Sequence, residues 1–232
     1  MQYQITDNQF LASLPGDAIE RLSPAFEWVE FNAGQTIIHD PVTHIYFPLN
    51  GLASFVLMSE SGGSSEIAIA GKEGLLGICV FLNSTTPIIP AIAQRSGQAI
   101  RVVAQAALQE FRRRDAFFIT ALSYIRVFFH QVAQTALCNA HHSLEQRFCR
   151  WLLLVADRLD EGEHVTMTQE AIASMLGVRR EAVTRVAHQL KRRNLKDYGT
   201  RRIEVIDRQG LMRASCECYS VLRREYDQIS GQ

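Results

Sequence analysis

The 232-residue sequence lacks a long unbroken apolar stretch, and the longest one, residues 151–156, is too short to cross a membrane. At its N-terminus there is no basic segment followed by an apolar one, the pattern of a secretory signal peptide. Nucleophile elbows, phosphate-binding P-loops and dinucleotide fingerprints are absent too. We therefore expect a cytoplasmic protein that has no membrane partner and is not an enzyme.

Cysteine is scarce and scattered, at Cys79, Cys138, Cys149, Cys216 and Cys218. An odd number of cysteines without a secretion signal predicts reduced thiols. Cys216-x-Cys218 is too closely spaced for the usual CxxC half of a zinc site, and no second pair completes it. We expect a plain thiol pair and no metal site; metal binding at this pair and a thiol redox switch are the alternatives.

The net charge of zero conceals an uneven distribution. Residues 1–139 hold eight Lys/Arg and eleven Asp/Glu, whereas residues 140–232 hold sixteen and thirteen. Residues 179–213 contain eleven basic and four acidic side chains, which gives this segment a net charge of +7. This concentration favours a phosphate-binding surface, with a merely solvated basic face as the alternative.

The first half of the chain, after a short helical stretch over 6–24, has a β-type pattern. Turn residues such as Asn50-Gly51 and Gly62-Gly63 separate the short runs. Regularly spaced strands of this kind predict an antiparallel roll, sandwich or barrel. The expected strands are 27–31, 36–38, 44–47, 52–58, 65–70 and 98–103.

Residues 108–139 contain no glycine or proline and predict one long helix. Apolar residues recur on it with heptad spacing, which favours pairing with a second helix. The expected homodimer seam is Phe111, Phe118, Leu122, Ile125, Phe129, Val132 and Ala136. A second stripe, Phe117, Ala121, Tyr124 and Phe128, is expected to pack on the chain's own β domain; the alternative to the dimer is a central helix buried in a monomer.

The stretch 168–188, TQEAIASMLGVRREAVTRVAH, predicts a helix-turn-helix. Its two helices are expected over 166–178 and 179–193, with Thr168 as N-cap and Gly177 at the turn. A helix capped by Ser143 is expected before them over 144–159. After them we expect a β-hairpin over 195–207, which forms a wing, and a helical tail over 208–232.

The second helix of this motif carries the side chains that suit base recognition. Arg180 fits a bidentate contact with guanine, Glu181 can accept a hydrogen bond from cytosine, and Arg185 can reach a base or a phosphate. Other residues of the motif and wing suit phosphate contacts, which position a protein without reading sequence. The predicted DNA-binding set is Thr168, Gln169, Arg179, Arg180, Glu181, Thr184, Arg185, His188, Arg201 and Arg202.

The order of these elements resembles the Crp/Fnr family of bacterial transcription regulators over nearly the whole chain. TQEAIASMLGVRREAVTRV is similar to the family motif, including the Arg-Glu pair and following Arg that read a TGTGA-like half-site. NAGQTIIHDPVTHIYFPLNGLASFV resembles the family's cyclic-nucleotide-binding-type roll. The resemblance implies an α+β fold: an N-terminal antiparallel β-roll of the jelly-roll kind, a long dimerisation helix and a C-terminal winged helix-turn-helix.

The resemblance also implies two domains. Residues 1–139 would hold the roll (about 25–107) and the dimerisation helix (about 108–139), and residues 140–232 the DNA-binding domain with its tail. A dimer would place two recognition helices ~34 Å apart on a palindromic operator. The implied partners are double-stranded DNA, a second copy of the chain and RNA polymerase.

The effector region departs from the family pattern. The family's cyclic-nucleotide binders carry Gly-Glu-Leu and then Arg-Ser or Arg-Thr, but here Ile89-Pro90 stands about where the arginine pair belongs. Without that cation a buried phosphate would cost several kcal/mol. We therefore expect no cofactor and no cyclic nucleotide. The residues left for an effector pocket are Glu73, Gly74 and Arg95.

Several alternatives for the sensor stay open. They are a true cyclic-nucleotide response, another small molecule, a protein partner or no effector. A haem held by His39 or His44 is a further possibility, and an iron–sulfur cluster is disfavoured because no cysteine precedes Cys79. A signalling or adaptor protein that does not bind DNA is the competing function.

Overall fold

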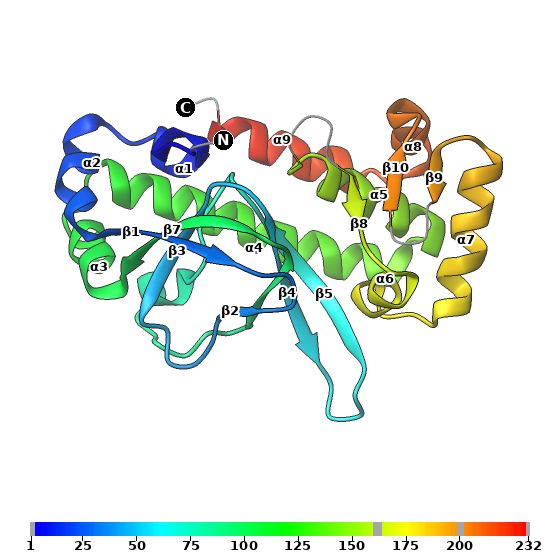
Figure 1. Ribbon diagram of the computed structural model, residues 1–232, viewed down its shortest axis with the longest axis horizontal. Coiled ribbons are helices and arrows are strands. Elements are labelled where there is room, and N and C mark those ends of the chain that lie inside the picture. The colour runs from blue at the N-terminus through cyan, green and yellow to red at the C-terminus, as the bar shows by residue number, and fades with distance from the viewer. Residues whose placement is uncertain (1–2, 160–163, 199–201, 231–232) are drawn as a thin grey trace. The chain divides into compact units, whose positions relative to one another are not determined.

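The computed structural model describes residues 3–159, 164–198 and 202–230 (Figure 1). The chain forms two compact units. The first comprises Met1–Phe55, Ile69–His130 and Arg224–Gln232, and the second comprises Val56–Ala68 and Gln131–Arg223. The expected mixture of helices with antiparallel sheets is confirmed.

The N-terminal stretch of the first unit consists of short helices. Pro15-Gly16 separates α1 from α2, and Leu11, Leu14 and Leu22 are buried beneath them. The elements are η1 (Ile5–Asp7), α1 (Gln9–Ala12), α2 (Gly16–Leu22) and η2 (Ser23–Ala25).

The β-roll is built from two antiparallel sheets, ordered β1-β7-β3 and β2-β6-β4-β5. All six expected strands are confirmed to within one residue. A seventh, β6, was not expected because its alternating alanines give little hydrophobic contrast. The strands are β1 (Phe26–Phe31), β2 (Thr36–Ile38), β3 (His44–Pro48), β4 (Leu52–Met58), β5 (Ser64–Ala70), β6 (Ala91–Arg95) and β7 (Gly97–Val103), with η3 (Ile78–Leu82) between β5 and β6.

Aromatic rings fill the core of the first unit. The Phe10 ring lies 5.5 Å from Phe47 and 5.5 Å edge-on from Phe117. A Cβ added to Gly74 would lie only 2.0 Å from Cε2 of Tyr124, so this position accepts only glycine. The second apolar stripe of the long helix, including Phe117 and Tyr124, is buried as expected.

The long helix expected over 108–139 is confirmed as α4 (Ala116–His141), but its predicted start is wrong, because the residues before a break at 113–115 belong to a separate helix, α3 (Ala104–Arg112). Arg114 at the break has φ of 61°, in the left-handed region. Arg21 from α2 bonds buried Glu110 at 2.6 Å and Asp115 at 3.2 Å. This ion-pair network joins the two sides of the break to a helix ninety residues earlier in the chain, which local sequence does not reveal.

The second unit contains α5 (Leu144–Ala156), which starts with a capping box. The Ser143 hydroxyl accepts from the Gln146 amide at 3.3 Å, and the Gln146 side chain accepts from the Ser143 amide at 3.0 Å. The expected tail is helical but divided at Ser215–Glu217. The remaining elements are β8 (Val165–Thr166), α6 (Gln169–Leu176), α7 (Arg180–Arg192), β9 (Lys196–Tyr198), β10 (Arg202–Val205), α8 (Arg208–Ala214) and α9 (Cys218–Ser230).

Candidate nucleic-acid interface

Helices α6 and α7 form the expected helix-turn-helix (Figure 1). The Thr168 hydroxyl accepts the Ala171 amide at 3.1 Å and so caps α6. Gly177 ends α6 with φ of 64°, the left-handed conformation that allows the chain to turn. The two helices bury their facing apolar residues, which are Ile172, Ala173, Leu176, Val183, Val186, Ala187 and Leu190.

The opposite face of α7 is polar and open to solvent. Arg180 occupies the first turn, its side chain is 63% exposed, and its guanidinium approaches Glu170 only to 4.0 Å. Glu181 lies beside it in the same turn, and Arg185 and His188 follow along the exposed face. Arg179 is the N-cap residue of α7 and makes no side-chain cap bond. The first turn of α7 thus presents charged side chains that are free to reorient toward a ligand.

Two residues expected to contact phosphate bond each other across the turn. The Thr184 hydroxyl lies 2.5 Å from the Gln169 side-chain oxygen and 3.1 Å from the Arg180 carbonyl. This pair joins the start of α6 to the first turns of α7. It therefore supports the geometry of the motif as well as lying on its polar side.

The expected wing is confirmed as an antiparallel hairpin of β9 and β10, in which Ile203 pairs with Tyr198 and Val205 with Lys196. A third strand, β8, pairs with β10 through Val165 and Thr166, and its two residues were too few to predict. Arg202 begins β10. Arg201 lies outside the described residues.

The motif packs on neighbours within the second unit. Arg147 of α5 donates to the Leu176 carbonyl at the end of α6, and Arg193 pairs with Glu145. The indole of Trp151 donates to Glu66 at 2.9 Å. These bonds hold α6 and the end of α7 against α5, and α5 against β5.

Much of the expected dimer seam lies on an open face of α4. Phe129 is 72% exposed, and Leu122 and Ala136 are exposed beside it. Phe118, Ile125 and Val132 are half-buried. Phe111 instead belongs to α3, where its ring stacks on Phe81 at 4.7 Å. The open seam is therefore shorter than the sequence pattern indicates.

Of the residues expected to line an effector pocket, Glu73 and Gly74 lie next to each other between β5 and η3, whereas Arg95 ends β6. Glu73 accepts the Gly71 amide at 3.1 Å, Gly74 packs under Tyr124, and Arg95 pairs with Leu52 across the sheet. A cavity of about 270 Å³ lies elsewhere in the roll, and none of the three lines it. Its lining comes from Val29, Glu30, Phe31, Gln35, Thr36, Ile37, His39, Tyr46 and Arg101.

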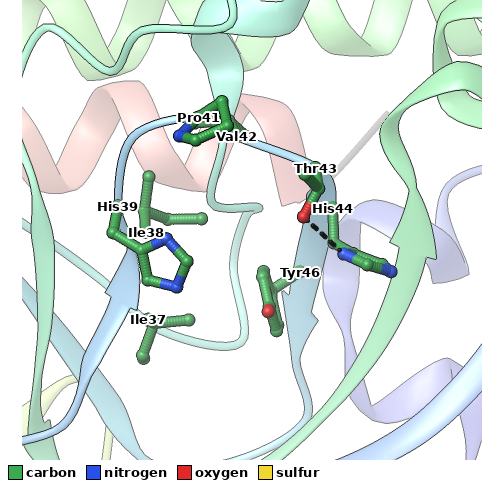
Figure 2. A pocket seen from close by; sticks show the side chains of 8 residues that line it. All are labelled: Ile37, Ile38, His39, Pro41, Val42, Thr43, His44 and Tyr46. Carbon is green, nitrogen blue, oxygen red and sulfur yellow. Dashed lines mark hydrogen bonds between the residues drawn. The ribbon is translucent and has the colours of Figure 1, made fainter.

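A smaller pocket beside this cavity holds both histidines considered for haem. Figure 2 shows Ile37, Ile38 and His39 on one side of it and Tyr46 on the other. His44 is turned aside, where its Nδ1 lies 2.9 Å from the Thr43 hydroxyl. With a volume of about 10 Å³, the pocket has room for little more than a water molecule.

The structure also gathers residues that sequence reasoning did not combine. Cys138 and His142, from the end of α4, lie beside Cys216 and Cys218. Cys138 and Cys216 are 78 residues apart in the sequence, so no local pattern indicates that they meet. All five cysteines of the chain are free thiols.

These geometric features define a winged helix-turn-helix DNA-binding domain, and comparison with known proteins agrees. Residues 146–214 match the Crp-like helix-turn-helix domain family. A search of curated proteins finds no significant match.

Solved structures resemble almost the whole chain. FixK2 from Bradyrhizobium japonicum is 16% identical with a TM-score of 0.71, covering 82% of this chain and 98% of its own. A transcriptional regulator of the crp/fnr family from Eubacterium rectale is 17% identical with a TM-score of 0.68, covering 94% and 99%. A CRP-family transcriptional regulator from Thermus thermophilus is 21% identical with a TM-score of 0.64, covering 81% and 96%.

The resemblance to the Crp/Fnr family inferred from the sequence is thereby confirmed. The chain has the fold of Crp/Fnr transcription regulators, and its residues 146–214 form a Crp-like helix-turn-helix domain.

Proposed function

We propose that the protein is a cytoplasmic, homodimeric transcription regulator that reads a palindromic, TGTGA-like operator. The observation that carries the proposal is the exposed first turn of α7, where Arg180 and Glu181 stand next to each other with Arg185 one turn further along. This is the arrangement needed to read base edges in the major groove. We assign Arg180 to a guanine, Glu181 to a cytosine and Arg185 to a base or phosphate.

The charge around the motif supports DNA as the partner. The net +7 over residues 179–213 includes the last turn of α7 and the start of α8. Thr168, Gln169, Thr184, Arg179, His188 and the wing arginines Arg201 and Arg202 are assigned to phosphates. Contacts of this type make affinity strongly dependent on salt.

The open face of α4 supports the dimer. Exposed Phe129, Leu122 and Ile119 form an apolar surface on a 26-residue helix, and burying such a surface is favourable. By length and composition alone α4 could also cross a membrane. Phe117, Ala121 and Tyr124 bury its other face within the protein, however, which favours a helix that a second copy covers.

We further propose that the roll senses an effector other than a cyclic nucleotide, or none. Support comes from Ile89-Pro90, which stands about where the family's cyclic-nucleotide binders have Arg-Ser or Arg-Thr for the phosphate. The cavity of about 270 Å³ is slightly smaller than typical small-molecule sites. When bound at a promoter as a regulator, the protein would also contact RNA polymerase.

A mobility-shift assay tests the proposal. The full chain is titrated onto a TGTGA palindrome and a scrambled duplex at several salt concentrations, with and without cyclic AMP, and native mass spectrometry checks for a co-purified ligand. We expect a shift specific to the palindrome that does not require the nucleotide. The absence of a specific shift under every condition would favour the adaptor function instead.

A further inference from the structure

Three cysteines and one histidine cluster in the second unit. The sulfur atoms of Cys138, Cys216 and Cys218 and a ring nitrogen of His142 all lie within 4.8 Å of one another. The three cysteines are buried and His142 is half-buried. None of these four residues belongs to the helix-turn-helix or to the exposed apolar face of α4.

Backbone geometry accounts for the cluster. Cys138 lies in the last turn of α4, and His142 directly follows the helix's final residue, His141, so the four-residue spacing keeps the two side chains on the same side. The amide of His142 donates to the Cys138 carbonyl at 3.1 Å, which keeps that turn closed. Cys216 and Cys218 flank Glu217 in the connection from α8 to α9. Each of two distant segments therefore supplies a pair of metal ligands.

The distances suit a tetrahedral ion. The sulfurs of Cys138 and Cys216 are 3.5 Å apart, and the Cys218 sulfur is 3.4 Å from His142 Nδ1. Zinc–sulfur bonds of about 2.3 Å and zinc–nitrogen bonds of about 2.0–2.1 Å imply separations of roughly 3.5–3.8 Å between tetrahedral ligands. These two pairs nearly have this spacing already, and because all four ligand atoms lie within 4.8 Å of one another, no pair needs to close by more than about 1 Å.

The surrounding polar groups also suit a metal. His142 directs Nδ1 at Cys218 and Nε2 at the Glu217 carboxylate, 3.3 Å away. A metal-bound histidine commonly donates its second N–H to a carboxylate in this way. Gln134 donates to the Cys218 sulfur at 3.1 Å, a bond that stabilises a thiolate.

A buried cation offsets the negative charge that thiolates would bring. The guanidinium of buried Arg150 donates to Thr135 through Nη2 at 3.0 Å, and its Nη1 has no hydrogen-bond partner in the described part of the chain. The hydrogen bond between Cys138 and Cys216 lowers the pKa of Cys138 although burial raises it, and the charge of Arg150 lowers it further. The same hydrogen bond raises the pKa of Cys216, so the favourable contribution that is independent of this pair is the positive charge of Arg150 near Cys138.

We propose that Cys138, His142, Cys216 and Cys218 form a Cys3His site for a thiophilic divalent metal ion, with zinc as the expected occupant. Sulfur and imidazole ligands favour zinc over magnesium and calcium. On binding, the three thiols release their protons and the ion links the end of α4 to the α8–α9 connection. A disulfide between Cys138 and Cys216 is the competing use, but it would leave Cys218 and His142 unexplained.

Cobalt substitution tests this site directly. The full chain is purified under reducing conditions, stripped of metal, and titrated with Co²⁺ and then Zn²⁺. We expect thiolate-to-cobalt charge-transfer absorption that saturates at about one equivalent per chain and is abolished by about one equivalent of zinc. If the folded, reduced wild-type protein shows no such absorption, the proposal is overturned, and mass-spectrometric detection of a Cys138–Cys216 disulfide would identify the competing use.

Matched variants assign the ligands. Cys218→Ser should lose most of the charge-transfer signal, whereas Cys149→Ser, which removes an equally buried thiol of the same unit, should retain it. Equal loss in both variants would contradict the assignment. Glu217→Gln alters an exposed residue that is not a ligand, and should weaken metal affinity about 10–100-fold without unfolding the chain. An unchanged affinity would contradict the orienting role given to the Glu217 carboxylate.

Discussion

At the scale of single residues, Arg180 carries most of the proposed specificity. Its side chain is largely exposed, so only a loose ion pair with Glu170, 4.0 Å away, must be broken before it meets a base. Arg180→Ala should weaken operator binding by about 1–3 kcal/mol and relax the preference at one base pair. Binding to a set of operators with single base changes, followed by fluorescence anisotropy, measures both effects.

Arg112→Ala is the matched control, because it removes an exposed arginine from α3 in the other unit. It should leave the affinity and the base preference unchanged. An equal loss by Arg180→Ala on every DNA sequence would instead make Arg180 a phosphate contact.

Gly177 shows what the turn of the motif requires of the backbone. Its φ of 64° is costly for a residue with a Cβ, while the space around it is open enough for one. Gly177→Ala should therefore destabilise the chain by about 1–2 kcal/mol, and Gly177→Asn by less, because asparagine tolerates this conformation. Urea unfolding followed by circular dichroism measures the change in midpoint.

Gly16→Ala provides the control, since Gly16 has open space and no left-handed backbone. It should not lower the midpoint. Identical midpoints for Gly177→Ala and the wild type would show that the turn relaxes without cost.

At the scale of elements, α4 is the helix whose two faces have different tasks. Its buried stripe packs inside the protein, while Phe129 lies on the open face. Phe129→Asp should leave the fold intact but place a charge in the seam, so that sedimentation velocity finds monomers instead of dimers. Ser123→Asp adds the same charge about 120° around the helix and should remain dimeric. A dimeric Phe129→Asp protein would mean that the seam is misassigned.

Elements defined by local chemistry were predictable from sequence. The strands of the roll, the Thr168 cap and the turn at Gly177 each have a signal within a few residues. The break between α3 and α4 was not predictable, because it contains no glycine or proline and rests on the distant Arg21. For the same reason the seam was extended to Phe111, which the structure places on Phe81.

At the scale of the whole molecule, the unequal charge and the helix-turn-helix pattern were enough to predict a DNA-binding regulator. The residues proposed to read bases, Arg180, Glu181 and Arg185, could be chosen because they lie close together along α7. The Cys138, His142, Cys216 and Cys218 cluster could not, because its two halves meet only after folding. A spacing rule applied to the Cys216-x-Cys218 pair alone misses ligands supplied by another helix.

In the proposed complex, two linked copies of the chain read two half-sites on one face of DNA. Fluorescence anisotropy at fixed salt tests it most directly, by comparing a TGTGA palindrome with the same palindrome lengthened by half a helical turn, about 5 base pairs. The rigid spacing of a dimer predicts that this insertion reduces affinity to that for unrelated DNA, a loss of about 10³-fold or more. Equal affinity for the two duplexes would contradict the account.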